Sequence, residues 1–239
     1  MSSFVLVHGA YHGAWCWYRV KPELESRGHE VVTFDLPAHG IDGTPYAETT
    51  LDGYVDRVRE AVERTDEPPV LVGHSMAGML ITAAAERVPS EIEALVYLTA
   101  YLPGDGESML DQRSEASLVT RHFEVDEERG VGWVPEEWLD EAFYADCAAE
   151  DRTLARSLVR PEPLDPISTP VTTTEERFGS VRRVYVGCTE DRAITPAQQE
   201  AAVEAHGVDL ELTLEASHSP FFSMPVATAD ALETAAERE

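Results

Sequence analysis

Short apolar runs alternate with helical patterns along the chain. The runs are rich in Val and Leu and continuous rather than interrupted at every second position, which is typical of strands buried on both faces of a sheet. Between the runs, apolar residues recur at helical spacing, as Leu51, Val55, Val58 and Val62 do. This alternation predicts an α/β fold with a mostly parallel sheet flanked by helices. We predict strands at residues 4–7, 30–36, 70–73, 94–99, 183–186 and 210–214, and helices at residues 15–26, 51–64, 76–87, 196–205 and 227–238.

One long segment interrupts the alternation. It carries charged and aromatic stretches, including Trp133, Trp138 and Phe143, and a run with four prolines. A long segment without core strands in a compact α/β domain is usually functional, and the aromatic residues argue against a disordered linker. We therefore expect a mainly helical lid at residues 104–180, inserted into a core made of residues 1–103 and 181–239.

The chain of 239 residues is 43% hydrophobic, which is enough for a sizeable core. Its 45 acidic residues against 18 basic ones give a net charge of −27. Such a chain repels polyanions, so neither nucleic acid nor an anionic membrane is an expected partner. The N-terminal residues lack the pattern of a signal peptide, and no apolar run reaches the roughly 18 residues that a membrane span needs.

The acidity has two interpretations. The more general one is an acidic enzyme from an organism whose proteins are rich in arginine, since Lys21 is the one lysine of the chain. The sharper one is adaptation to high salt, because carboxylates hold water and cations while salt screens their mutual repulsion.

Three cysteines occur, Cys16, Cys147 and Cys188, an odd number without metal-binding spacing. They are expected to be buried thiols in a reducing compartment, so we predict a cytoplasmic protein without a disulfide framework. A single reactive cysteine is the alternative. Neither a metal nor an organic cofactor is implied.

The strongest chemical signal is the segment 70–78, VLVGHSMAG, in which an apolar strand runs into Gly-x-Ser and a helical pattern follows. This is the context of a nucleophile elbow, which predicts Ser75 as a nucleophile. The second glycine of the usual G-x-S-x-G is Ala77 here, followed by Gly78. The alternative is a helix N-cap serine without a catalytic role.

A serine hydroxyl needs a base to remove its proton, and His218 lies just past the last predicted strand, where open α/β sheets place their chemistry. Asp191 follows the strand at 183–186 and is expected to orient that histidine. The order Ser75, Asp191, His218 is the one expected for a triad on this fold. Glu190 and Asp105 are the rival carboxylates. Of the other histidines, His8, His12, His39 and His74 are expected to be structural or to contact substrate, and His29, His122 and His206 to be solvated or packed.

The backbone N–H groups of Ala10 and Met76 are the expected oxyanion donors, the first because a His-Gly segment ends the first strand. We expect substrate to contact Gly9, Tyr11, His12 and Ser219 of the core. From the lid we expect contributions by Trp133, Trp138 and Phe143. Such a pocket suits a small apolar or aromatic molecule.

Several segments resemble the plant methylesterase and hydroxynitrile-lyase family of the α/β-hydrolase superfamily. They are FVLVHGAYHGAWCWYRV (4–20) with the following Lys-Pro, GHEV (28–31), DLPAHG (35–40) and GHSMAG (73–78), and they span most of the core but not the lid. The resemblance implies the α/β-hydrolase fold, with the lid after the core strand that is sixth in that fold. Its prokaryotic members are carboxylesterases, similar to salicylate esterases and pyrethroid hydrolases. It is compatible with a homodimer.

The lyase branch of that family carries a threonine after the histidine of the first strand and a lysine after the catalytic histidine. Here these positions are Gly9 and Ser219, as in the esterase branch. The sequence therefore predicts a serine carboxylesterase that acts through an acyl-enzyme on a small-molecule ester. The alternatives are lyase, lactone or C–C bond hydrolysis chemistry on the same triad, and a small-ligand receptor without enzymatic activity.

Overall fold

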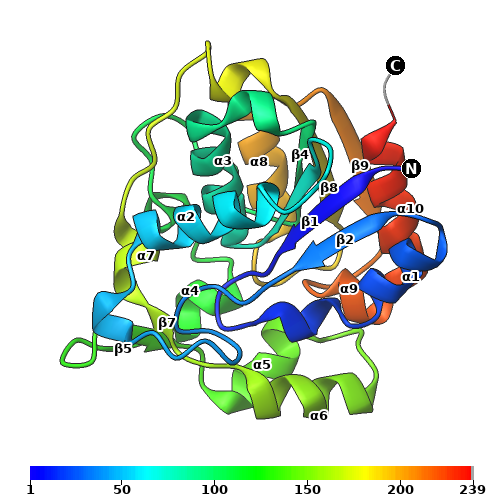
Figure 1. Cartoon of the computed structure of the whole chain (residues 1–239). Coiled ribbons are helices and arrows are strands. Elements are labelled where there is room, and N and C mark those ends of the chain that lie inside the picture. Colours follow the sequence, from blue (N-terminus) through cyan, green and yellow to red (C-terminus); the bar gives the residue numbers. More distant parts are fainter. Residues whose placement is uncertain (238–239) are drawn as a thin grey trace.

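Six strands form one sheet in the order β2-β1-β3-β4-β8-β9, and all neighbouring pairs are parallel (Figure 1). The structure is a computed structural model that describes residues 1–237, so the predicted end of the last helix at Arg238 lies outside them. Because the strands run the same way, their carboxyl ends meet at one edge of the sheet. The strands are β1 (Ser3–Val7), β2 (Glu30–Thr33), β3 (Val70–His74), β4 (Ala94–Leu98), β8 (Arg182–Cys188) and β9 (Leu210–Leu214).

Helices cover both faces of this sheet, as predicted. Helix α1 packs beside α10, and α2 packs beside α3 (Figure 1). Strands β1, β3 and β4 are buried along their whole length, which is the reason that their sequences read as continuous apolar runs. None of the helices within residues 1–237 is long and apolar enough to cross a membrane. The core helices are α1 (Val20–Ser26), α2 (Leu51–Val62), α3 (Ala77–Arg87), α8 (Pro196–His206), α9 (Pro220–Ser223) and α10 (Pro225–Ala236).

Two predicted elements are shorter than expected. The helix predicted at 15–26 is a 3-10 turn (Ala14–Trp17) followed by α1, and the strand predicted at 30–36 ends at Thr33. Between them, the Asp35 carboxylate accepts hydrogen bonds from Ala14 N (2.7 Å) and Ile41 N (3.0 Å) and so ties two turns together. The sequence also gave no sign of α9, a four-residue helix.

We call the residues between β4 and β8 the cap; α5 and α6 lie along the lower side of Figure 1, and the last part, with the turn Phe178–Ser180, runs beside α3 at the top. Besides helices, the cap contains a small antiparallel sheet, β5-β6-β7, that the sequence did not predict. Its strands of two or three residues are too short to leave a pattern. The cap elements are two 3-10 turns (Met109–Gln112, Phe178–Ser180), α4 (Leu118–His122), β5 (Glu124–Asp126), β6 (Val131–Trp133), α5 (Glu136–Phe143), α6 (Ala149–Leu158), β7 (Glu162–Pro163) and α7 (Leu164–Ser168).

Candidate active site

Ser75 lies on the sharp turn between β3 and α3, with a φ of +55° that L-residues rarely adopt. The turn is crowded at two glycines. A Cβ added at Gly73 would lie 2.7 Å from the Ala77 oxygen, and one at Gly78 would lie 1.9 Å from the Tyr101 oxygen. The close approach therefore falls at Gly73 and Gly78, which is why the motif tolerates alanine at position 77.

Strained backbone gathers at the edge of the sheet where the site lies. Among residues 1–237, the non-glycine residues with positive φ are Tyr11, Ala38, Ser75 and Thr99, and they follow β1, β2, β3 and β4 respectively. Each such residue costs about 1–3 kcal/mol and persists only where its surroundings hold it. This clustering favours the carboxyl edge as the place of a functional site.

His218 and Asp191 lie together at that edge. His218 follows β9 and its Nδ1 is 2.7 Å from Asp191 Oδ2, while both side chains are buried. Asp191 Oδ1 accepts hydrogen bonds from Ala193 N (2.6 Å) and Ile194 N (3.0 Å), which fix the carboxylate toward the histidine. The structure therefore brings together the carboxylate and the imidazole that the sequence singled out.

The backbone around His218 is held from several sides. His74 Nε2 donates a hydrogen bond to the carbonyl oxygen of His218 (2.8 Å), and the two rings are 4.6 Å apart. From the cap, Asp146 Oδ2 accepts a hydrogen bond from Ser217 N (3.0 Å), and the ring of Phe143 lies 5.5 Å from that of His218. The histidine loop thus depends on the cap as well as on the core.

The rival carboxylates lie elsewhere. Glu190 is exposed, and Asp105 is exposed and accepts a hydrogen bond from Thr173 N (2.9 Å). The structure brings neither of them to His218.

The turn after β1 carries the predicted oxyanion donor Ala10. His8 Nε2 accepts from Leu36 N (3.1 Å), so its Nδ1 carries the hydrogen and donates to the Gly9 oxygen (2.9 Å). His12 Nδ1 donates to the Ala10 oxygen (2.7 Å). The second predicted donor, Met76, precedes the first residue of α3, where backbone N–H groups lack acceptors within the helix.

Three buried histidines near the site, His8, His12 and His74, have lowered pKa values. Burial lowers the pKa of His12 to about 4, with the nearby His218 and His39 adding to the effect. Burial also lowers the pKa of His8 and of His74 well below the ordinary value. His39 behaves differently: burial disfavours its charged form, but the Glu162 carboxylate and its hydrogen bond outweigh burial and raise the pKa of His39. Of the remaining histidines, His29 and His206 lie beside Glu233 and Glu107, and His122 stacks on Trp138 at 3.7 Å.

Ser75 and His218 line one cavity, with a volume of about 330 Å³ including its open mouth. Of the predicted contact residues, Tyr11, His12 and Phe143 line it, as does Ala10. The structure does not bring Trp133, Trp138 or Ser219 to its wall, and Gly9 lies behind Ser75. The sequence did not single out the other lining residues, which are Tyr101, Met109, Val119, Ala193 and Ile194.

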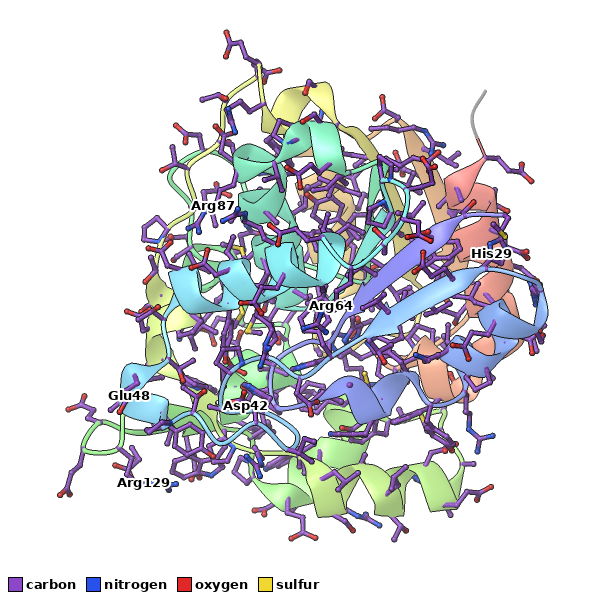
Figure 2. All side chains as sticks on the ribbon, in the orientation of Figure 1. His29, Asp42, Glu48, Arg64, Arg87 and Arg129 are labelled. Carbon is purple, nitrogen blue, oxygen red and sulfur yellow. The ribbon has the colours of Figure 1, made fainter. Side chains whose placement is uncertain are left out.

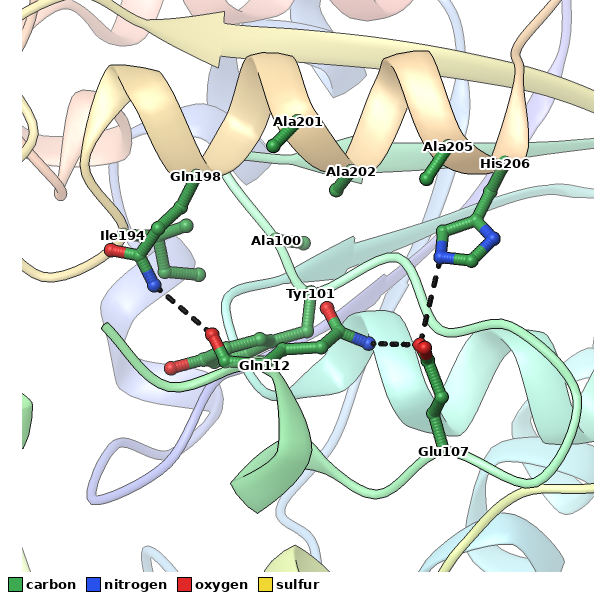
Figure 3. A pocket seen from close by; sticks show the side chains of 10 residues that line it. All are labelled: Ala100, Tyr101, Glu107, Gln112, Ile194, Gln198, Ala201, Ala202, Ala205 and His206. Carbon is green, nitrogen blue, oxygen red and sulfur yellow. Dashed lines mark hydrogen bonds and ion pairs between the residues drawn. The ribbon is translucent and has the colours of Figure 1, made fainter.

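A second cavity, of about 580 Å³ including its open mouth, adjoins this one, and Tyr101 and Ile194 line both. Figure 3 shows its alanine-rich wall on α8 and a polar side on which Gln112 and His206 both approach Glu107. Tyr101 follows β4 and Ile194 follows Asp191, so position after a strand could have suggested them. No pattern in the sequence marks Met109 or Val119 of the cap.

Within the described chain, no group of three or more His, Cys, Asp or Glu side chains is arranged to hold a metal ion. Cys16, Cys147 and Cys188 are unpaired and buried. Burial raises the pKa of each thiol, which keeps it protonated and unreactive.

The chain is similar in sequence and in structure to known proteins. A profile described as the alpha/beta hydrolase family matches residues 4–231. Salicylic acid-binding protein 2 of Nicotiana tabacum is 38% identical over 221 residues, covering 86% of this chain and 85% of that protein. Methylesterase 9 of Arabidopsis thaliana is 34% identical over 100% of this chain and 99% of its own length. The crystal structure of polyneuridine aldehyde esterase superposes with a TM-score of 0.89 at 30% identity, covering 99% of this chain and 100% of that one.

Proposed function

This chain belongs to the alpha/beta hydrolase family and is an esterase, and from that premise we propose that Ser75, His218 and Asp191 act as its catalytic triad. One observation carries the proposal. Ser75, raised on a strained elbow, lines the same cavity as His218, and His218 in turn is 2.7 Å from the buried carboxylate of Asp191.

The proposed reaction passes through an acyl-enzyme. Ser75 Oγ attacks the ester carbonyl while His218 Nε2 takes the hydroxyl proton, because Nδ1 is engaged by Asp191. The carbonyl oxygen becomes an oxyanion that accepts hydrogen bonds from the N–H groups of Ala10 and Met76, worth roughly 3 kcal/mol each. His218 then protonates the leaving alcohol, and afterwards it takes a proton from the water that releases the acid.

We propose a small apolar or aromatic carboxylic ester as the substrate. The cavity wall is rich in apolar and aromatic side chains, among them Tyr101, Phe143 and Val119. A relative at 38% identity is named for binding salicylic acid, which is a small aromatic acid, and others are named methylesterases. The adjoining cavity behind Tyr101 and Ile194 offers room for a longer acyl or alcohol group.

Two features argue against cyanohydrin cleavage. A methyl group at Gly9 would lie 2.8 Å from Ser75 Cβ, so the threonine of the lyase branch has no room here without displacing the nucleophile. Lys21, the one lysine, is on α1, donates to the Val31 oxygen of β2 and is not among the residues of the cavity. The lysine of the lyase branch, which would hold cyanide as an anion, therefore has no counterpart at the cavity.

We also propose that residues 104–180 act as a cap over the site, and that the protein works in a reducing, salt-rich environment. The cap supplies Met109, Val119 and Phe143 to the cavity. Three buried free thiols favour a reducing compartment, the cytoplasm. The net charge of −27 favours a salt-rich environment, because salt screens the repulsion among the acidic residues, which outnumber the basic ones and include exposed side chains such as Glu48 (Figure 2).

A panel of substrates tests the function. Turnover of p-nitrophenyl acetate and of the methyl esters of aliphatic and aromatic acids is measured for the native protein and for Ser75→Ala, with mandelonitrile as the lyase substrate. We expect ester hydrolysis by the native protein alone and no release of cyanide. Equal ester turnover by both proteins would remove the proposal, and cyanide release that depends on Ser75 would favour the lyase alternative.

A further inference from the structure

The turn after β1 is held by the cap as well as by the core. Tyr11 has a φ of +67°, which a non-glycine residue adopts only where its surroundings enforce it. Its N–H donates to Glu162 Oε2 (3.1 Å), and its carbonyl oxygen accepts from Arg160 N (2.9 Å). Both backbone groups of this strained residue are therefore bound by one short segment of the cap, residues 160–162.

Glu162 is wholly buried, although it is a carboxylate. Its Oε2 also lies 3.0 Å from His39 Nε2, and its Oε1 accepts the hydroxyl hydrogen of Tyr54 (3.0 Å). An unpaired carboxylate is too costly to bury, whereas one that accepts three hydrogen bonds and faces an imidazolium is tolerated. Glu162 and its two side-chain partners therefore join three parts of the fold: the cap through Glu162, the turn after β2 through His39, and α2 through Tyr54.

His39 is positioned to be that imidazolium. Its second nitrogen, Nδ1, lies 3.1 Å from the Pro37 carbonyl oxygen and 3.2 Å from the Tyr54 hydroxyl oxygen. Because the Tyr54 hydroxyl hydrogen is donated to Glu162, both ring nitrogens face acceptors and both can donate. A ring that donates from both nitrogens carries a positive charge. The charge on His39 compensates that on Glu162, which leaves the Glu162 oxygens as fixed acceptors for Tyr11 N–H.

The same turn carries Gly9 and Ala10. The Gly9 carbonyl oxygen accepts a hydrogen bond from His8, and the Ala10 carbonyl oxygen accepts one from His12. Contacts on Gly9 and Ala10 therefore come from the core, and contacts on Tyr11 come from the cap. We propose that Glu162, paired with His39, is a positioning residue that holds the oxyanion-binding turn so that the Ala10 N–H meets the reacting carbonyl. This inference rests on the proposed function, since an oxyanion forms only if Ser75 attacks an ester.

A purely structural role would look different, and the chain offers a matched case. Asp151 is a second cap carboxylate, 2% exposed, that accepts hydrogen bonds from Arg19 and Tyr18. It fastens α6 to the core but contacts none of the residues that line the catalytic cavity. Loss of Asp151 should weaken the docking of the cap without moving the oxyanion donor.

The test compares Glu162→Ala with Asp151→Ala, and uses Glu162→Gln as the conservative variant. Benzyl trifluoromethyl ketone, which adds to the serine and places an oxyanion between the donors, is measured as an inhibitor beside the corresponding trifluoromethyl carbinol, which cannot add. Glu162→Ala should lower kcat about a hundredfold, because a shift of the donor by about 1 Å costs that much, and should weaken the ketone by a similar factor. KM and carbinol affinity should change less than about threefold.

Glu162→Gln should recover most of the loss, because its oxygen can still accept from Tyr11 N–H. Asp151→Ala should lower the melting temperature but weaken the binding of the ketone and of the carbinol by the same factor. If Glu162→Ala does not fold, His39→Gln takes its place, because this variant removes the counter-charge and keeps a hydrogen-bond donor. The ratio of ketone affinity to carbinol affinity should then fall severalfold.

Equal weakening of ketone and carbinol in Glu162→Ala, or kcat equal to that of Asp151→Ala, would overturn the inference. Ser75→Ala separates this failure from failure of the proposed function. If Ser75→Ala abolishes turnover and ketone binding while Glu162→Ala behaves like Asp151→Ala, only the positioning role is wrong. If Ser75→Ala keeps its turnover, the proposed function itself is wrong.

Discussion

Thr99 donates its hydroxyl hydrogen to Asp191 Oδ2, the same carboxylate oxygen that faces His218. Thr99 follows β4 with a φ of +37°, and its N–H donates to the Val186 oxygen (2.8 Å). With the two backbone donors on Asp191 Oδ1, the carboxylate accepts three hydrogen bonds besides its contact with the histidine. The orientation of Asp191 thus depends on a threonine from a neighbouring strand.

Thr99→Val removes this hydroxyl and keeps the shape of the side chain. A hydrogen bond to a charged group contributes about 1.5–3 kcal/mol, so we expect kcat for p-nitrophenyl acetate to fall about tenfold or more. Thr99→Ser keeps the hydroxyl and should retain activity within about threefold of the native protein. Native turnover in Thr99→Val would mean that the backbone N–H groups alone orient Asp191.

Gly9→Ala tests the close packing behind the nucleophile. The added methyl would lie 2.8 Å from Ser75 Cβ and 2.9 Å from His74 Nδ1, so one of these groups must move. We expect kcat/KM to fall about a hundredfold, because small displacements of reacting groups are costly. Gly43→Ala is the matched control, since a methyl there meets no atom within 4 Å, and its activity should equal that of the native protein. Unchanged turnover in Gly9→Ala would show that Ser75 tolerates displacement.

Acid should destabilise the fold through its buried neutral histidines. Burial lowers the pKa of His12 from 6.5 to about 4. Because the unfolded chain takes up a proton that the folded one refuses, stability is complete above about pH 6.5 and falls as pH drops toward about 4. At about 1.4 kcal/mol per pH unit, His12 accounts for up to roughly 3 kcal/mol.

The measurement is the melting temperature of the native protein and of His12→Gln from about pH 7 to about pH 5. The variant loses the hydrogen bond with Tyr144 and should melt lower at neutral pH, but its melting temperature should fall less on acidification. Parallel curves for the two proteins would assign the acid sensitivity to His8 and His74 instead.

Salt should stabilise the protein if its acidity is an adaptation to high salt. With 45 acidic and 18 basic residues, self-repulsion is strong in dilute buffer and is screened as the Debye length falls from about 10 Å at 0.1 M to about 3 Å at 1 M salt. We expect the melting temperature to rise in molar KCl. A sucrose series gives the effect of an uncharged solute, and a KCl curve no steeper than that one would contradict the adaptation.

The three members of the proposed triad stand out in the sequence because each is tied to the end of a core strand. Ser75, Asp191 and His218 follow β3, β8 and β9, and parallel strands bring such positions to one edge. The elbow adds a local constraint, since its crowding restricts residues 73 and 78 to glycine. Local sequence therefore points to these three residues, although Gly9 and Ser219 of the core do not line the cavity.

The cap side could not be predicted in the same way, because its packing depends on contacts distant in sequence. Trp133 and Trp138 were selected for their aromatic rings, yet Trp138 stacks on His122 and neither lines the cavity. Glu162 lies in a proline-rich run where nothing in the sequence marks it as buried. Only the fold reveals that His39, 123 residues away, is its partner.

The most direct test of the account is the mass of the protein during turnover. The native protein is quenched in acid while it hydrolyses p-nitrophenyl acetate, and the intact chain and its peptides are weighed by mass spectrometry. We predict a species heavier by one acetyl group, located on the peptide that contains Ser75 and absent from Ser75→Ala. Two results would contradict the account. One is hydrolysis by Ser75→Ala at the native rate without that adduct, and the other is an adduct on a different residue that turns over.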